Sequence, residues 1–266
     1  MTSGPADYHH VLVERDGPRV TVTMNRPQRR NALSLEHLQE LLAVFRAIGE
    51  SDATGVVLAG NGPVFSSGHD FADMDGADLA AMRRLLSTCT DVMLTMQDIP
   101  QVVIARVHAL ATAAGCQLVA TCDLAVAAQS AGFAIPGGKG GLFCHTPLVA
   151  VARNVGRKRA LELLLLGEMI DAPTALDWGL VNRVVPPASL DAAVDRIAAR
   201  IASLSATAVA DGKRSFYQQV DVPIAAAYGC ATPSMVDDVL GADAVEGVAA
   251  FLTKRRPVWP SAHPLP

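Results

Sequence analysis

IARVHALATAAGCQLVATCDL, residues 104–124, carries the clearest structural signal in the chain. The apolar run at 102–105 that leads into it is typical of a buried strand. Ala113, Ala114 and Gly115 then form a turn of small residues that brings the backbone close to a ligand before a helix begins. Unpaired amides and the dipole at a helix N-terminus favour developing negative charge. The segment therefore predicts a strand, a turn and an oxyanion-binding helix N-terminus.

The composition is that of a globular protein with a large core. The chain has 266 residues, of which 50% are hydrophobic, and this length suits one large domain or one domain with a helical appendage. Its apolar runs are short, and none approaches the roughly 20 residues of a membrane span. Residues 1–10 lack the profile of a signal peptide. We therefore expect a soluble cytoplasmic protein.

Charge and cysteine content argue against several other classes of protein. A formal net charge of -4 at pH 7 gives no basic footprint for nucleic acid. The five cysteines show no paired metal spacing, and their odd number argues against a disulfide framework. We expect buried free thiols, with no metal site, no nucleic-acid partner and no membrane partner.

Alternating and apolar runs predict the order of strands and helices. Short strands at 11–14 and 20–24 flank a turn at 16–18 and predict a hairpin. Ser34 suits the N-cap of a helix with one apolar face. Further strands are predicted at 55–59, 124–128 and 181–185, and helices at 77–97 and over most of the chain from Thr146 onward. This order indicates an α/β core with a C-terminal helical region.

Several short motifs accompany the segment at 104–124. They are PVFSSGHD at 63–70, MNRP at 24–27, NAL at 31–33 and GLVNRVVP at 179–186. Together these motifs resemble those of the crotonase superfamily, the enoyl-CoA hydratases and isomerases, over roughly residues 8 to 258. The runs TAAGCQL and GLFC are similar to the branch called enoyl-CoA hydratase domain-containing protein 3.

The resemblance implies a fold and a class of ligand. The fold is an α/β spiral of repeated β/β/α turns, with residues 1–200 as the core around an acyl-CoA pocket and residues 201–266 as a C-terminal helical trimerisation region. The partner implied is an acyl-CoA thioester, in fatty acid metabolism, within a homotrimer or a dimer of trimers. No cofactor is expected to be bound permanently, because coenzyme A arrives as part of the substrate.

The motif matches assign roles to individual residues. By resemblance, the backbone N–H groups of His69 and Ala114 form an oxyanion hole for the thioester carbonyl. Each such donor is worth about 2.7–4 kcal/mol to a transition state with developing negative charge. The coenzyme A pocket is expected to include Arg29, Ala32, Ser67 and Asp70. The alternative for the loop at 63–70 is an ordinary Ser/Gly/Asp turn without a ligand.

Two positions depart from the family pattern. Gln117 stands where hydratases carry one catalytic Glu, and Gly137 stands after Pro136 where they carry the other. Glutamine has no titratable proton, and glycine has no side chain. Because each general acid or base contributes about 10²–10⁴-fold, we expect hydration of a 2-enoyl-CoA to be slow.

Other groups offer alternatives for the chemistry. His145, Asp73 or Asp75 would permit isomerisation, decarboxylation or thioester hydrolysis if one of them reached the acyl group. The alternative from another class is a protein that binds acyl-CoA without catalysis. Two acids suit structural roles instead: Asp171 as a helix cap before Ala172-Pro173, and Asp123 at the start of a strand.

Overall fold

The computed structural model describes residues 8–262 and contains two sheets. The larger sheet has the strand order β1-β2-β3-β4-β6-β9. Its first pair is antiparallel and all its other pairs are parallel. The strands are β1 (Val11–Asp16), β2 (Arg19–Met24), β3 (Gly55–Gly60), β4 (Val102–Val107), β6 (Leu124–Ala128) and β9 (Arg183–Val185). The predicted hairpin is therefore confirmed, as are the strands at 55–59 and 124–128.

A second, smaller sheet makes the fold a spiral. It consists of β5 (Ala111–Thr112), β7 (Gly132–Ala134) and β8 (Ile170–Asp171). Along the chain, β4 and β5 lead into α3 (Ala114–Thr121), and β6 and β7 lead into α4 (His145–Asn154). The chain thus repeats a strand from the large sheet, a strand from the small sheet and a helix. This repeat confirms the predicted β/β/α fold class.

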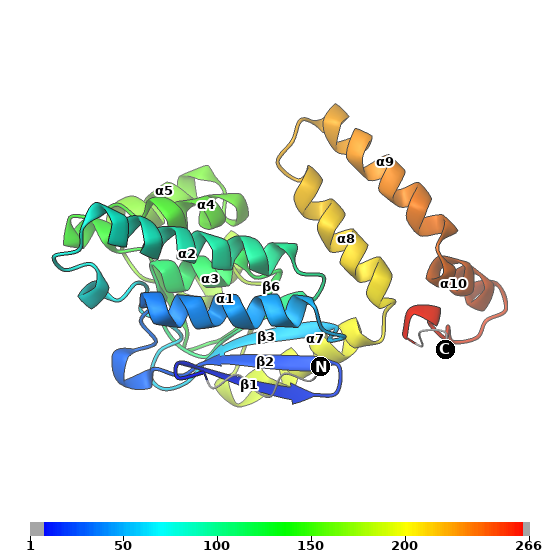
Figure 1. Ribbon diagram of the computed structural model, residues 1–266, viewed down its shortest axis with the longest axis horizontal. Coiled ribbons are helices and arrows are strands. Elements are labelled where there is room, and N and C mark those ends of the chain that lie inside the picture. Colours follow the sequence, from blue (N-terminus) through cyan, green and yellow to red (C-terminus); the bar gives the residue numbers. More distant parts are fainter. Residues whose placement is uncertain (1–7, 263–266) are drawn as a thin grey trace.

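Helices cover both faces of the large sheet. On one face lie α1 (Leu35–Gly49), α2 (Leu79–Asp98) and α3, and on the other lies α7 (Leu190–Ala202), which packs on β3, β4 and β6 (Figure 1). Ser34 caps α1, as predicted, because its side chain accepts a hydrogen bond from His37 N at 3.3 Å. Leu38, Leu41 and Phe45 of α1 are fully buried against the sheet, and each contributes about 1.5–3 kcal/mol through burial of its apolar surface.

Two predicted elements have different bounds in the structure. The helix predicted at 77–97 begins at Leu79, because the Asp78 side chain accepts from Ala81 N at 2.8 Å and caps the helix there. The strand predicted at 181–185 begins at Arg183. The reason is that the Asn182 side chain, rather than a backbone carbonyl, accepts the hydrogen bond from Ala125 N at 2.7 Å.

The remaining helices complete the helix-rich end that the sequence predicts. They are α5 (Arg157–Leu166), α6 (Ala172–Trp178), α8 (Ala206–Gln219), α9 (Ile224–Leu240) and α10 (Ala242–Leu252). Of the last three, α8 contacts α2 and β4, whereas α9 and α10 lie farther from the sheet (Figure 1). α9 buries none of its side chains. Within residues 8–262, no helix combines the length and apolar character needed to cross a membrane.

The cysteines are all free thiols, as predicted, but they are not all buried. Cys89 and Cys116 lie in the core, whereas Cys230 is exposed on α9. Cys230 is exposed because α9 contacts too little of the chain to bury any side chain.

Candidate active site

Two loops meet at the start of α3. Thr112 N donates to Ser66 O at 2.9 Å, which joins the loop after β3 to the turn before α3. A Cβ atom on Gly68 would lie 3.2 Å from Ala114 N, and one on Gly115 would lie 2.5 Å from Ser66 O. The loops approach so closely that residues with side chains do not fit at Gly68 and Gly115. Gly68 also has a φ of 85°, which favours glycine.

The amides of His69 and Ala114 lie on these two adjoining segments. Gly68 O accepts from Leu33 N at 2.8 Å, and Asp70 N donates to Leu33 O at 3.2 Å. Because backbone groups alternate in direction along an extended segment, the His69 N–H points away from Leu33. Ala114 is the first residue of α3, where an amide has no partner within the helix. Within residues 8–262, neither N–H donates a hydrogen bond, and Ala114 itself is fully buried.

Ala113, between the small sheet and α3, has a strained backbone. Its φ is 48° and its ψ is -118°, a conformation that glycine adopts easily and alanine does not. Its amide donates to Ala134 O at 2.9 Å, and this bond ties the turn to β7. Strain of this kind costs about 1–3 kcal/mol. The hydrogen bond to Ala134 holds the backbone in this conformation where α3 begins.

Relief of this strain gives a testable prediction. We expect Ala113→Gly to raise the free energy of unfolding by about 1 kcal/mol, since the relieved strain exceeds the roughly 0.4–1 kcal/mol that glycine costs through the unfolded state. Urea denaturation measures the change. Ala120→Gly, within α3, is the control and should destabilise by about 0.5–1 kcal/mol. Equal losses from both substitutions would contradict the argument.

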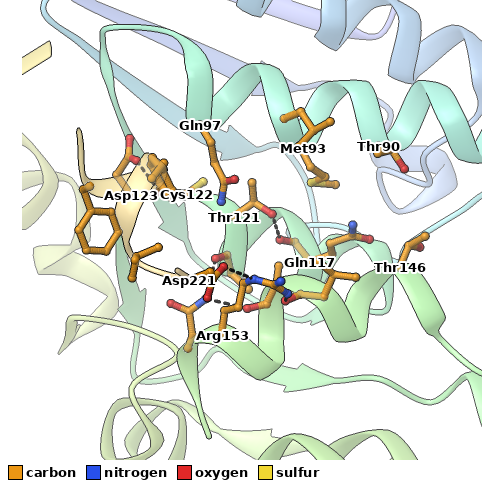
Figure 2. Close-up of a pocket in the computed structure, with 18 residues that line it drawn as sticks. Thr90, Met93, Gln97, Gln117, Thr121, Cys122, Asp123, Thr146, Arg153 and Asp221 are labelled. Carbon is orange, nitrogen blue, oxygen red and sulfur yellow. Dashed lines mark hydrogen bonds and ion pairs between the residues drawn. The ribbon is translucent and has the colours of Figure 1, made fainter. Parts of the chain in front are cut away.

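Gln117 lies one turn into α3 and lines a cavity of about 420 Å³ between α2, α3, α4 and α8. Figure 2 shows this cavity, with Gln117 towards the end near Thr146 and with Asp123 at the opposite end. The Gln117 side chain is 4% exposed. Its Oε1 atom has no hydrogen-bond partner in the part of the chain that the structure describes. The position predicted for a catalytic side chain thus holds a buried, unpaired amide.

Gly137 lies in a loop that leaves no room for a side chain. A Cβ atom there would lie 2.5 Å from Cys144 Sγ and 2.5 Å from Leu142 O. A glutamate at this position would therefore require a shift of the segment that leads into α4. Burial raises the pKa of the neighbouring Cys144 thiol, which therefore stays protonated near neutral pH and supplies no negative charge beside Gly137.

The residues expected to bind coenzyme A form one cluster beside the first loop. Asp70 accepts from Arg26 at 3.2 Å and from Arg29 at 3.1 Å. Burial acts to raise the pKa of Asp70, but the Ala72 amide and the two arginines lower it overall. Ser67 N donates to Arg30 O at 3.0 Å, and Ala32 is buried. The Arg29 side chain is 52% exposed and can reach an anion in solvent.

The three side chains predicted as alternatives for the chemistry lie away from Gln117. His145 is exposed at the start of α4, with its ring centroid 5.1 Å from that of Phe143. The Asp73 carboxylate accepts from Leu35 N at 2.6 Å and so caps α1. Asp75 is exposed. None of the three lines the cavity at Gln117.

Both structural predictions for acids are confirmed. Asp171 caps α6, since its carboxylate accepts from Thr174 N at 2.8 Å. Asp123 accepts from Val103 N at 2.7 Å, next to the first residues of β4 and β6.

Sequence reasoning missed three parts of the site. The first is the α8 wall of the cavity, which includes Phe216 and Tyr217. The second is the ion pair between Arg153 and Asp221 at 2.7 Å, also on the lining. The third is the imidazole of His69, whose pKa is lowered by burial and whose Nε2 has no partner within residues 8–262. No local pattern signals the first two, because each joins segments far apart in sequence. The family-like loop pointed only to the amide of His69.

The chain is similar to known proteins over most of its length. The family described as enoyl-CoA hydratase/isomerase matches residues 18–262. The chain is 46% identical over 248 residues to the enoyl-CoA hydratase domain-containing protein 3, mitochondrial, of Rattus norvegicus, covering 92% of this chain and 82% of that protein.

Solved structures show the same likeness. An enoyl-CoA hydratase from Mycobacterium smegmatis superposes with a TM-score of 0.92 and 47% identity, covering 94% of this chain and 98% of that one. Human enoyl coenzyme A hydratase domain-containing protein 3 gives a TM-score of 0.92 and 43% identity, covering 94% and 100%. The chain therefore belongs to the enoyl-CoA hydratase/isomerase family of the crotonase superfamily, in the branch of enoyl-CoA hydratase domain-containing protein 3.

Proposed function

We propose that this chain binds an acyl-CoA thioester and polarises its carbonyl oxygen with the backbone amides of His69 and Ala114. The observation that carries the proposal is that two unpaired N–H groups lie on adjoining loops, one of them at a helix N-terminus. Such donors stabilise the negative charge that develops on the oxygen of an enolate or a tetrahedral intermediate. The coenzyme's phosphates would lie beside the exposed guanidinium of Arg29.

Hydration at this site is slow in the proposed mechanism. Water becomes a good nucleophile only when a base removes its proton, and the Gln117 amide is not a base. Gly137 has no side chain and so adds no second acid. Two missing general acid–base contributions of about 10²–10⁴-fold each correspond to roughly 5–11 kcal/mol of barrier.

A second candidate, binding without catalysis, is favoured by the lining of the cavity. Its charged side chains are already paired: Asp123 with Lys213 at 2.8 Å and Arg153 with Asp221 at 2.7 Å. Tyr217 donates to Asp123, and burial raises the pKa of the Cys122 thiol. Among the described residues that line the cavity, none is therefore an unpaired general acid or base.

Calorimetry and two activity assays test the proposal. We expect purified protein to bind butyryl-CoA and to hydrate trans-2-butenoyl-CoA slowly, as followed by the loss of the conjugated-thioester absorbance. Exchange of the butyryl α-protons in D₂O, followed by NMR, separates the two candidates, because only an enolate-forming enzyme catalyses it. Absence of acyl-CoA binding would refute both candidates, and rapid hydration would refute the role given to Gln117 and Gly137.

We also infer that the C-terminal helices assemble the chain into a homotrimer or a dimer of trimers. Large apolar side chains are exposed along α9 and α10, among them Tyr228, Val236, Leu240 and Phe251, the last at 82% exposure. A helix with no buried side chain gains little stability from its own chain. A second copy that covers these residues would remove their apolar surface from water.

Light scattering after size-exclusion chromatography measures this assembly. We expect wild type to elute as a trimer or hexamer and the double variant Val236→Glu/Leu240→Glu to elute as a monomer, because two buried charges oppose the interface. Gln218→Glu, on exposed α8 surface, is the control and should leave the mass unchanged. A monomeric wild type would contradict the inference.

A further inference from the structure

Asn31 is a buried polar residue with an unusual backbone conformation. It is fully buried, and it follows the short 3-10 helix η1 (Pro27–Arg29). Its φ is 50°, and Arg30 before it has a φ of 52°. Few residues other than glycine adopt this left-handed region, and asparagine is among those that do. The two successive left-handed residues turn the chain at this point, and the Asn31 side chain lies in the interior of the protein.

The Asn31 side chain joins two loops. Its Oδ1 accepts from Arg26 N at 2.9 Å, within the loop before α1. Its Nδ2 donates to Asn61 O at 2.8 Å, in the loop after β3. The same nitrogen lies 3.1 Å from Val64 O and 3.1 Å from Phe65 O, farther along that loop. A side-chain amide has two N–H donors and one carbonyl acceptor, and these contacts use all three.

The end of β3 leaves space for this amide. A Cβ atom on Gly60 would lie 3.2 Å from Asn31 Nδ2 and 2.6 Å from Phe65 O. A residue with a side chain at Gly60 would therefore displace either the amide or the loop that it contacts. A buried amide costs free energy unless its groups are paired. Since the partners of Asn31 Nδ2 are backbone carbonyls, the loop has to keep its path for the amide to stay paired.

A second set of hydrogen bonds links Asn31 to the peptide group that carries the His69 amide. The hydroxyl of Ser66, which is fully buried, donates to Asn31 O at 2.8 Å and accepts from Gly68 N at 3.3 Å. The Gly68 carbonyl accepts from Leu33 N at 2.8 Å. Because the Gly68 carbonyl and the His69 N–H belong to one planar peptide group, these bonds also fix the direction of the His69 N–H.

From these contacts we propose that Asn31 is a positioning residue, whose buried amide holds the loop at 61–68 so that the His69 N–H points at the thioester oxygen. This inference rests on the proposed role of the His69 and Ala114 amides. Asn31 acts through the loop and does not touch the ligand. A misplacement of about 1 Å can cost about 10²-fold in rate, so the path of this loop decides how strongly the carbonyl is polarised.

Infrared spectroscopy of bound butyryl-CoA, labelled with carbon-13 at its carbonyl, tests the inference. Hydrogen bonds to a carbonyl oxygen lower its stretching frequency, so the shift on binding measures polarisation without turnover. We expect Asn31→Gly to lose most of the shift seen with wild type, because glycine tolerates a φ of 50° but has no amide side chain. Its affinity for coenzyme A alone should match wild type, because Asp70 still pairs with Arg26 and Arg29.

Two further variants separate positioning from stability. Ile48→Ala removes a buried side chain near the other end of α1, about 20 Å along the helix axis from Leu35. It should lower the urea midpoint and keep the full shift. Ser66→Ala retains the Asn31 amide and removes only the hydroxyl between Asn31 O and Gly68 N. It should lose part of the shift, and it tests the same path if Asn31→Gly does not fold.

The outcomes distinguish this inference from the proposed function. If wild type does not bind butyryl-CoA, or binds it without a carbonyl shift, the proposed function fails and the inference fails with it. If wild type shows the shift and either Asn31→Gly or Ser66→Ala keeps it in full, the function stands and the inference is overturned. An equal loss of the shift in Ile48→Ala would also overturn it, because the shift would then follow stability rather than the position of one loop.

Discussion

Gln117→Glu should raise the rate of trans-2-butenoyl-CoA hydration by about 10²–10⁴-fold over wild type, the range for a single general acid–base group. The substitution is nearly isosteric, so the buried side chain keeps its place on α3. Burial raises the pKa of a carboxylate at this position, which is 4% exposed. A pKa closer to neutral pH suits a group that must accept a proton from water. The new group would remove the proton that glutamine leaves on the attacking water.

The gain should be partial because the second acid stays absent. At Gly137 a Cβ atom would lie 2.5 Å from both Cys144 Sγ and Leu142 O. We therefore expect Gly137→Glu to add little activity to Gln117→Glu and to lower stability. Because residues 142–144 pack against this position, restoring full hydratase activity would also require changes there.

The measurement is loss of the conjugated-thioester absorbance at matched protein concentrations. Gln97→Glu is the control, since it adds a carboxylate to the same cavity from α2, away from the oxyanion loops, and should leave the rate unchanged. Two results would count against the argument. Rapid hydration by wild type would mean that another group supplies the proton chemistry, and an inert Gln117→Glu variant that still binds butyryl-CoA would mean that the amides do not activate the thioester.

The local features of the fold could be predicted from sequence because their causes are local. Ser34 caps α1 three residues from its partner amide, and the apolar period of the helix that follows is regular. The turn before α3 carries its own signature of small residues. The family-like motifs predicted roles for the His69 and Ala114 amides, and the structure brings the two loops that carry them into close contact.

The cavity could not be predicted because it joins segments far apart in the chain. Its walls combine α2, α3, α4 and α8, and the pairing of Arg153 with Asp221 spans 68 residues. The close packing at Gly137 depends on the path of the chain at Cys144, and no single residue of the sequence predicts that path. The resemblance predicted that Gln117 and Gly137 replace two family acids, but the close packing at Gly137 and the unpaired amide of Gln117 could not be predicted.

Lys213→Met should be the most destabilising single substitution that leaves the sheet intact, at about 3–5 kcal/mol, because it removes one partner of a buried ion pair. Lys213, on α8, lies 2.8 Å from the Asp123 carboxylate and donates to Met96 O and Gln101 O at 2.8 Å each. Burial lowers the pKa of Lys213, although Asp123 acts to raise it. In the variant, the largely buried Asp123 carboxylate loses its cation but keeps the hydrogen bonds from Val103 N and Tyr217, and the Met96 and Gln101 carbonyl groups lose their donor.

The loss should concentrate on α8. Lys213 and Tyr217, which donates to Asp123 at 2.8 Å, fasten this helix to the starts of β4 and β6. Since Phe216 and Tyr217 also wall the cavity, we expect faster amide exchange in α8 and weaker butyryl-CoA binding together. Urea denaturation and hydrogen exchange measure the two effects.

The control is Lys158→Met, an exposed lysine on α5, which should change stability by less than about 0.5 kcal/mol. A double variant, Lys213→Met with Asp123→Asn, should lose less than the sum of the two single variants, because the second change removes the charge that the first leaves unpaired. Additive losses would show that the two side chains stabilise the fold independently. In that case α8 is held by its apolar contacts, and the hydrogen bonds of Lys213 and Tyr217 to Asp123 do not link the core to the wall of the cavity.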